Sequence, residues 1–169
     1  PADINETLEC WQIALKSKNT PSAIALSRQK LPYINPSFTK KNKCEFGAYI
    51  VNATSQNYMI NLIASGSEVE IALEAQKKLK ELQIESKVVS MPCQELFDQQ
   101  DDSFKNKIID KNIPVITVEA SSVCSWEKYS NHNMGIKTFG ESAPYKEVYS
   151  HFNLTSAKVV DLAKKIIKQ

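Results

Sequence analysis

From residue 48 to the end of the chain, short runs dense in Val, Ile and Tyr alternate with longer amphipathic stretches. The runs have the length of strands, and the stretches between them have the three- and four-residue apolar spacing of helices. Strands that alternate with helices in this way build a mostly parallel sheet covered by helices on both faces. The sequence therefore predicts a three-layer α/β/α domain, which we place at residues 47–169.

Apolar spacing and helix-capping residues predict the individual elements. Strands are expected at 48–54, 59–64, 85–90, 114–119 and 136–139, and helices at 68–82, 94–100, 102–109, 144–149 and 156–167. Only a short polar turn separates the first two strands, which favours an antiparallel hairpin and one reversed strand in the sheet. The run 114–119 is rich in β-branched residues, so we expect it inside the sheet rather than at its edge.

Several predicted helices begin at a residue suited to capping the free backbone amides of the first turn. The predicted caps are Asp3 with Glu6, Ser67 with Glu70, Asp101 or Asp102, and Thr155. The first and second of these have the spacing of a capping box, in which the third helical residue reaches back to the cap.

The first 34 residues predict one helix and one strand that belong to a different α/β unit. The helix starts at Ile4 and is followed, after Pro21, by a short buried strand at Ser22–Leu26. Its apolar stripe consists of Leu8, Trp11, Ala14 and Leu15. A single helix and strand cannot bury their own apolar faces, so we expect this remnant to dock on something else.

Arg28 follows that predicted strand and is the strongest candidate binding residue. The carboxyl end of a buried strand is where α/β proteins meet their ligands, and a guanidinium is a permanently charged fork suited to phosphate or carboxylate. An internal ion pair would use the same chemistry. The residues alone leave these two interpretations open.

Residues 35–46 have the composition of a linker, rich in Pro, Asn, Ser and Lys. The basic cluster Lys40, Lys41 and Lys43 is interpreted as a solvated surface rather than a phosphate or membrane patch. The formal net charge is only +2, so neither part of the chain has a nucleic-acid footprint. No apolar run is long enough for a membrane span and no signal pattern is present, so we expect a cytoplasmic protein.

Other candidate groups have structural explanations that we favour. Gly66 and Ser67 follow a strand and open a helix, and ordinary capping is favoured over phosphate binding because one glycine falls short of a dinucleotide or P-loop motif. Glu119 ends a predicted strand and could act as an acid or base, but structural use is favoured. His132 and His151 are interpreted as surface or capping residues.

The four cysteines are scattered without a C-x-x-C pair. Cys10, Cys44, Cys93 and Cys124 are expected to be free buried thiols rather than a disulfide framework or a zinc site. The residues therefore predict no catalytic constellation within this chain.

Several sequence blocks, in the same order along almost the whole chain, resemble the C-terminal quarter of transketolase. The N-terminal blocks are Pro1-Ala2-Asp3 with Asn5-Glu6-Thr7, and Leu26-Ser27-Arg28-Gln29-Lys30-Leu31-Pro32. The later blocks are Ala64 to Val69, Val89 to Pro92, Glu95 to Phe97, Val118 to Ala120, Trp126 to Tyr129 and Phe139 to Pro144. The resemblance implies that 1–34 is the tail of a pyrimidine-binding domain, 35–46 a linker, and 47–169 a C-terminal domain with a mixed five-stranded sheet.

That resemblance implies a homodimeric enzyme that moves a two-carbon ketol unit between phosphorylated sugars, with thiamine diphosphate and Mg²⁺ or Ca²⁺ bound by regions outside this chain. Arg28 matches the arginine that binds the sugar phosphate in this family, and no other functional residue of the family maps onto this chain. We therefore expect the chain alone to be inactive and to support dimer assembly. The alternatives are a free-standing regulatory or phosphate- or nucleotide-binding module that uses Gly66 and Ser67, and a non-catalytic subunit of a split enzyme.

Overall fold

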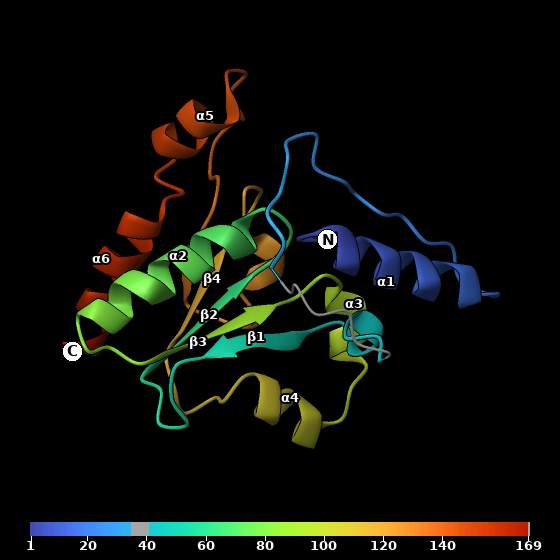
Figure 1. Ribbon diagram of the computed structural model, residues 1–169, viewed down its shortest axis with the longest axis horizontal. Coiled ribbons are helices and arrows are strands. Elements are labelled where there is room, and N and C mark those ends of the chain that lie inside the picture. The colour runs from blue at the N-terminus through green and yellow to red at the C-terminus, as the bar shows by residue number, and fades with distance from the viewer. Residues whose placement is uncertain (35–40, 169) are drawn as a thin grey trace.

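A computed structural model describes residues 1–34 and 41–168 and contains one five-stranded sheet between helices (Figure 1). The sheet order is β1-β3-β2-β4-β5, and neighbouring strands run parallel except β1 and β3. The expected α/β fold with a mixed, mostly parallel sheet is confirmed. The strands are β1 (Tyr49–Ala53), β2 (Ile60–Ala64), β3 (Ser86–Ser90), β4 (Val115–Val118) and β5 (His132–Met134).

β2 forms the centre of the sheet and is buried along its whole length. Leu62 lies opposite Val88 of β3 on one side and opposite Ile116 of β4 on the other. The predicted hairpin between the first two strands is therefore wrong, because β1 pairs antiparallel with β3 at the sheet edge. A strand that is apolar on both faces is best covered between two neighbours, whereas the partly exposed β1 suits an edge.

Helices cover both faces of the sheet, and each face has its own hydrophobic core. On one face, α2 (Glu68–Glu81) packs beside α6 (Ser156–Ile167) (Figure 1). On the other face lie α3 (Gln94–Asp98), α4 (Asp102–Ile108) and the 3₁₀ turn η2 (Cys124–Trp126). None of the helices within residues 1–34 and 41–168 combines the length and apolar character that crossing a membrane requires.

Three of the predicted helix caps are present. The Asp3 side chain accepts from the backbone N–H of Glu6, and Asp101 and Thr155 accept in the same way at α4 and α6. The predicted capping box at Ser67 is wrong, since its hydroxyl makes no capping bond to α2. Ser67 has helical dihedral angles, whereas a residue that caps a helix with its side chain is typically extended.

The predicted helix at the start of the chain is α1 (Ile4–Lys16), but the predicted strand at Ser22–Leu26 is wrong. That segment has no regular structure, and Leu26 is exposed. A strand needs a neighbouring strand for its hydrogen bonds, and within residues 1–34 and 41–168 the segment Ser22–Leu26 pairs with none of the strands β1 to β5. Part of the predicted linker, residues 35–40 with Pro36 and Lys40, lies outside the described residues.

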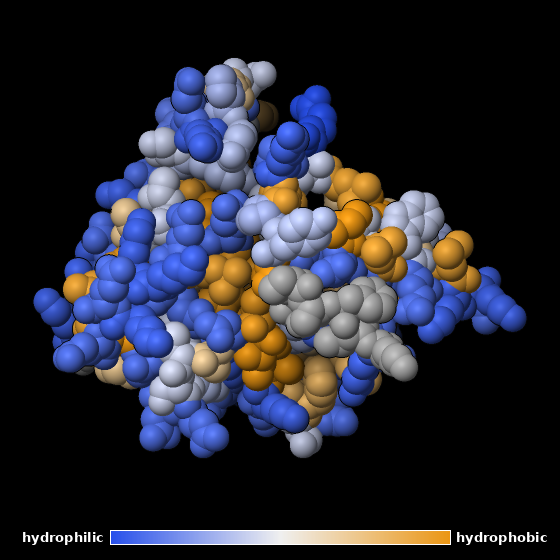
Figure 2. Space-filling view, in the orientation of Figure 1, coloured by the Kyte–Doolittle hydropathy of each residue, from blue (hydrophilic) through white to orange (hydrophobic). Residues whose placement is uncertain are grey.

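The apolar stripe of α1 faces outward. Leu8 is 54% exposed, Trp11 52% and Leu15 77%. Figure 2 shows hydrophobic side chains in orange along the part of the surface over α1. The opposite side of α1 contacts the 3₁₀ turn η1 (Cys44–Phe46) next to β1.

The last strand lies earlier in the chain than predicted. β5 consists of His132–Met134, whereas the predicted strand at 136–139 is irregular and ends in Phe139, which is 94% exposed. Gly135 follows β5 where a side chain would clash, because a Cβ there would lie 2.5 Å from Val123 and 2.8 Å from the carbonyl oxygen of Ser121. This close approach of another segment favours glycine at position 135.

Candidate functional site

The carboxyl ends of β2 and β4 lie side by side where the chain connections diverge. The connection after β2 leads to β3, and the connection after β4 leads to β5 on the other side of the sheet. In open α/β sheets ligands bind at such a switch point. Ser65 follows β2 and Glu119 follows β4, and the Ser65 hydroxyl donates a 2.7 Å hydrogen bond to Oε2 of Glu119.

A second carboxylate, Glu68 in the first turn of α2, joins this pair and is 4% exposed. The Ser67 hydroxyl donates a 2.8 Å hydrogen bond to Oε1 of Glu68. The Tyr149 hydroxyl, from α5 (Tyr145–His151), donates to the same oxygen and lies 2.9 Å from the Ser67 hydroxyl. We call these five residues, Ser65, Ser67, Glu68, Glu119 and Tyr149, the switch-point cluster.

Burial raises the pKa of Glu119 to about 7, and the neighbouring Glu68 carboxylate raises it as well. The hydrogen bond from Ser65 opposes that rise. Burial, followed by the charge of Glu68, also raises the pKa of Tyr149, so its hydroxyl stays a neutral donor. Two adjacent carboxyl groups resist ionising together. The switch-point cluster therefore holds a proton that titrates near neutral pH.

This arrangement disfavours an anion at Gly66 and Ser67. Gly66 has a left-handed φ of 52°, which turns the chain from β2 into α2. The Ser67 hydroxyl is committed to Glu68 and Tyr149. Because Glu68 and Glu119 lie beside the turn, a phosphate there would meet two carboxyl groups. The contacts of Glu119 support its structural interpretation, whereas Ser67 bonds to Glu68 and Tyr149 instead of capping α2.

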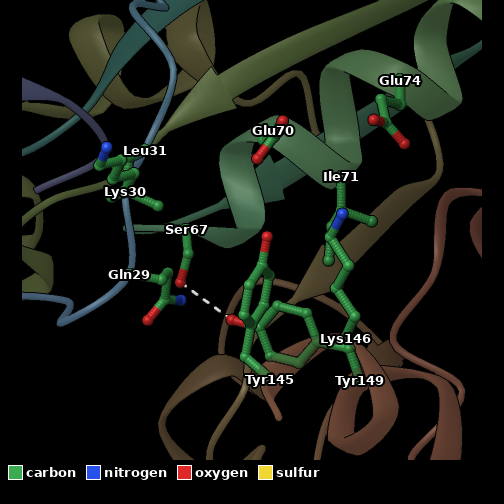
Figure 3. A pocket seen from close by; sticks show the side chains of 10 residues that line it. All are labelled: Gln29, Lys30, Leu31, Ser67, Glu70, Ile71, Glu74, Tyr145, Lys146 and Tyr149. Carbon is green, nitrogen blue, oxygen red and sulfur yellow. Dashed lines mark hydrogen bonds between the residues drawn. The ribbon is translucent and has the colours of Figure 1, made fainter.

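A cavity of about 210 Å³ lies between α2, α5 and the segment before the linker (Figure 3). Figure 3 shows Tyr145 and Tyr149 on one side of it, with the Ser67 to Tyr149 hydrogen bond at its base. Its charged lining is mixed, with two glutamates and two lysines. The lining residues are Gln29, Lys30, Leu31, Ser67, Glu70, Ile71, Glu74, Tyr145, Lys146 and Tyr149.

Arg28 lies in the irregular segment immediately before the residues that line this cavity, but it does not line the cavity itself. Its side chain is exposed. Within residues 1–34 and 41–168 it makes no hydrogen bond or ion pair, so the internal ion pair left open above is not formed among those residues. The guanidinium fork is free to meet a ligand or a neighbouring protein segment.

The remaining candidates lie apart from one another. His132 is on β5 and His151 is at the end of α5, where its ring packs 4.8 Å from Phe152. All four cysteines are free, as predicted, but only Cys44 is buried and Cys124 is exposed. Across the part of the chain that the structure describes, no three or more His, Cys, Asp or Glu side chains gather to hold a metal ion.

Comparison with known proteins identifies the family. A sequence model of the Transketolase-like TK C-terminal domain matches residues 47–155. The chain belongs to the transketolase family. A transketolase from Sinorhizobium medicae is 41% identical over 173 residues, covering 100% of this chain and 25% of the relative.

Solved transketolase structures have the same fold. A transketolase from Leishmania mexicana matches with a TM-score of 0.91 and 38% identity, covering 99% of this chain and 24% of that one. A Pichia stipitis transketolase, described as a complex with sedoheptulose 7-phosphate, matches with a TM-score of 0.91 and 34% identity over the same shares. The chain thus spans about a quarter of the length of the transketolases it matches, and its sheet is that of their C-terminal domain.

Sequence reasoning found Glu119 and Ser67 but missed Glu68 and Tyr149, which join them. Glu68 reads as an ordinary first-turn acid that complements the helix dipole, and nothing in its spacing shows that it is buried. Tyr149 lies on a short helix 82 residues after Ser67. The signal that could have found the cluster is the strand order. β2 and β4 are adjacent parallel strands, so the residues that directly follow them lie close together.

Proposed function

We propose that this chain is the C-terminal part of a working transketolase, an enzyme that transfers a two-carbon ketol unit between phosphorylated sugars in the pentose phosphate pathway. The observation that carries the proposal is the match of the transketolase C-terminal model to residues 47–155, with similarity to transketolases over the whole chain. Thiamine diphosphate and Mg²⁺ or Ca²⁺ would be bound by other regions of the enzyme, which would work in the cytoplasm.

In this proposal, residues 1–34 are the tail of the pyrimidine-binding domain, 35–46 are the linker and 47–169 are the C-terminal domain. The exposed apolar stripe of α1 supports the division. Leu8, Trp11 and Leu15 are more than half exposed although a helix in a finished domain buries such a stripe. The remainder of the pyrimidine-binding domain would cover them.

Arg28 is proposed to bind the phosphate of the sugar. Its exposed guanidinium and the lack of an internal partner among the described residues support this role. A charged, bidentate donor suits a phosphate dianion. The Pichia stipitis neighbour is described as a complex with a sugar phosphate, which shows that relatives of this chain meet ligands of this class.

The C-terminal domain itself is proposed to be inactive alone and to support the homodimer. The switch-point cluster supports this view, since its carboxyl groups are occupied by Ser65, Ser67 and Tyr149. The alternative of a free-standing phosphate- or nucleotide-binding module would need an anion beside Glu68 and Glu119, which their charge disfavours.

Kinetics of Arg28→Ala in a full-length enzyme that carries this chain test the proposal. Losing charge-assisted hydrogen bonds to phosphate should raise KM for the sugar phosphate by about 10- to 100-fold. Lys18→Ala is the matched control, because Lys18 is exposed and lies in the same N-terminal segment. An unchanged KM in Arg28→Ala contradicts the assigned phosphate contact.

Calorimetry on the chain of 169 residues tests the second part of the proposal. We expect no saturable binding of thiamine diphosphate with Mg²⁺, and no turnover of sugar phosphates. Saturable cofactor binding, or a phosphate-dependent rise in melting temperature that Ser67→Ala abolishes and Arg28→Ala leaves intact, would favour the free-standing module instead.

A further inference from the structure

The loop that carries Arg28 has no hydrogen bonds of its own. It runs from the end of α1 at Lys16 to Tyr33 and has no regular structure. Within residues 1–34 and 41–168, no residue from 18 to 33 donates or accepts a hydrogen bond. A loop of this kind is positioned by the points where the chain beside it is held. The placement of Arg28 therefore depends on what fixes the neighbouring segments.

Asp3 joins the start of α1 to the end of this loop. Its Oδ1 accepts a 2.8 Å hydrogen bond from the backbone N–H of Glu6, which caps α1, the helix that leads into the loop. Its Oδ2 accepts a 3.0 Å hydrogen bond from the backbone N–H of Ile34, directly after the loop. One carboxylate thus connects two segments that lie 31 residues apart in sequence.

Both partners in this connection are firmly held. Asp3 is 5% exposed, and its carbonyl oxygen accepts hydrogen bonds from the Thr7 hydroxyl at 2.8 Å and from the Thr7 backbone N–H at 3.0 Å. Ile34 packs against the hydrophobic core that α2 and α6 build on one face of the sheet. A hydrogen bond between two such points constrains the chain that leads away from them.

The segment between Ile34 and Arg28 is short and stiffened. Pro32 has a restricted φ, and it also restricts the conformation of Leu31 before it. Residues 29–31 line the cavity that α2 and α5 also border (Figure 3). The segment is therefore fixed at one end by Asp3, stiffened by Pro32 and placed beside the C-terminal domain.

We propose that Asp3 is a positioning residue for substrate binding, because its hydrogen bond to Ile34 holds the Arg28 loop where the guanidinium meets the phosphate of the sugar. This inference rests on the proposed role of Arg28. Misplacing a binding group by about 1 Å weakens a directed contact strongly. In this role Asp3 acts through Arg28 and not through a contact of its own with the substrate.

Asp3→Ser and Asp3→Asn separate this role from helix capping. Serine and asparagine cap helices as well as aspartate does, so α1 keeps its start. In Asp3→Ser the single hydroxyl that accepts from Glu6 leaves the N–H of Ile34 without its acceptor. In Asp3→Asn the NH₂ group faces that N–H, so two donors oppose each other. Both variants lose the bond to Ile34 and retain the cap.

Steady-state kinetics in a full-length enzyme that carries this chain test the proposal. We expect both variants to raise KM for xylulose 5-phosphate by about 3- to 10-fold with kcat nearly unchanged. The kcat/KM for unphosphorylated xylulose should stay within about 2-fold of the parent, because that sugar offers Arg28 no phosphate. Removing a negative charge would by itself favour an anion, so a higher KM has the sign of lost positioning rather than of lost charge.

A double-mutant cycle with Arg28→Ala gives the deciding comparison. If Asp3 acts through Arg28, adding Asp3→Ser to Arg28→Ala should change KM by less than about 2-fold. A rise of the same size in both backgrounds, or no rise in the Asp3 variants while Arg28→Ala raises KM, would overturn the positioning role. An unchanged KM in Arg28→Ala would refute the phosphate contact itself, and the positioning role with it.

Asp101→Ser is the matched control. Asp101 caps α4 by accepting a 2.8 Å hydrogen bond from the backbone N–H of Phe104, and α4 lies on the other face of the sheet. We expect its KM to stay within about 2-fold of the parent, since the cap is retained and no other segment depends on it. A rise equal to that of Asp3→Ser would overturn the proposal, because it would follow from losing a carboxylate at any helix cap.

Discussion

The Tyr49 phenol on β1 donates a 2.7 Å hydrogen bond to Oε1 of Glu6 on α1. The Ser90 hydroxyl, at the end of β3, donates to the same oxygen, and the backbone N–H of Ala2 donates to Oε2 at 2.7 Å. Glu6 is 2% exposed, so a buried carboxylate receives three donors from three different parts of the chain. This one side chain joins α1 to the edge of the sheet.

Replacing Glu6 should loosen that junction. In Glu6→Gln the amide oxygen can still accept from Tyr49 and Ser90, but the NH₂ group faces the N–H of Ala2. Buried donors without acceptors cost ~1–3 kcal/mol, and we expect a loss of that order in the free energy of unfolding, measured by urea denaturation. Glu70→Gln, exposed on α2, should change it by less than about 0.5 kcal/mol. Equal stability of the two variants would contradict the assigned role of Glu6.

Glu6 shows which contacts of a residue the sequence predicts and which it does not. Its spacing from Asp3 predicts the start of α1 correctly, because capping is a local property of three or four residues. The partners of Glu6, however, lie 43 and 84 residues later in the chain. The local sequence cannot distinguish a glutamate whose side chain bonds the backbone at its own helix cap from one whose side chain bonds residues far along the chain.

Gly47 offers a sharper test of local geometry. It has a φ of 82°, and a Cβ there would lie 2.3 Å from the Cys93 carbonyl oxygen and 2.3 Å from the Phe97 backbone nitrogen. Gly47→Ala should therefore destabilise the domain by more than about 3 kcal/mol, since backbone atoms of two segments must move. Thermal unfolding measures the loss.

Gly140→Ala is the matched control for this substitution. Apart from its chain neighbours, no atom of the described residues lies within 4 Å of a Cβ at that position. We expect its melting temperature to stay within about 2 °C of the parent. A similar loss in both variants would show that the close approach at Gly47 is not what limits substitution there.

Trp11 tests the proposal that another part of the protein covers α1. Its side chain is 52% exposed, so Trp11→Gln in this chain should change the free energy of unfolding by less than about 1 kcal/mol and reduce self-association in sedimentation velocity. In a full-length enzyme the same change should destabilise by about 2 kcal/mol or more, because a covered tryptophan loses its packing. Equal effects in both proteins would contradict a covering domain.

The errors in the predicted strands have a common physical origin. The run Ser22–Leu26 has the composition of a strand, yet it is irregular, and no strand in the described part of the chain pairs with it. The runs at 48–54 and 59–64 are both strands, but pairing depends on which neighbour best covers each face, and β2 lies between β3 and β4. Composition therefore predicts that a segment is extended, whereas its partner is decided by the whole sheet.

The switch-point cluster predicts how stability depends on pH. The pKa of Glu119 is about 7 in the folded chain, against an ordinary value of 4.5. Between pH 4.5 and pH 7, Glu119 holds a proton in the folded chain that it has released in the unfolded chain. The contribution of Glu119 to the free energy of unfolding is therefore fully present below pH 4.5 and is lost as the pH rises through 7. Within the cluster, the neighbouring Glu68 adds to the effect of burial on Glu119, and the hydrogen bond from Ser65 opposes it.

Glu119→Gln should remove this dependence. The amide oxygen can still accept from Ser65, and no charge forms beside Glu68 at high pH. We expect the variant to be more stable than the parent by ~1–3 kcal/mol at pH 8 and nearly equal to it at pH 4.5, measured by denaturation across that range. Glu127→Gln, which is exposed, should follow the parent at every pH. A Glu119→Gln curve parallel to that of the parent would show that Glu119 ionises as freely in the folded chain as in the unfolded one.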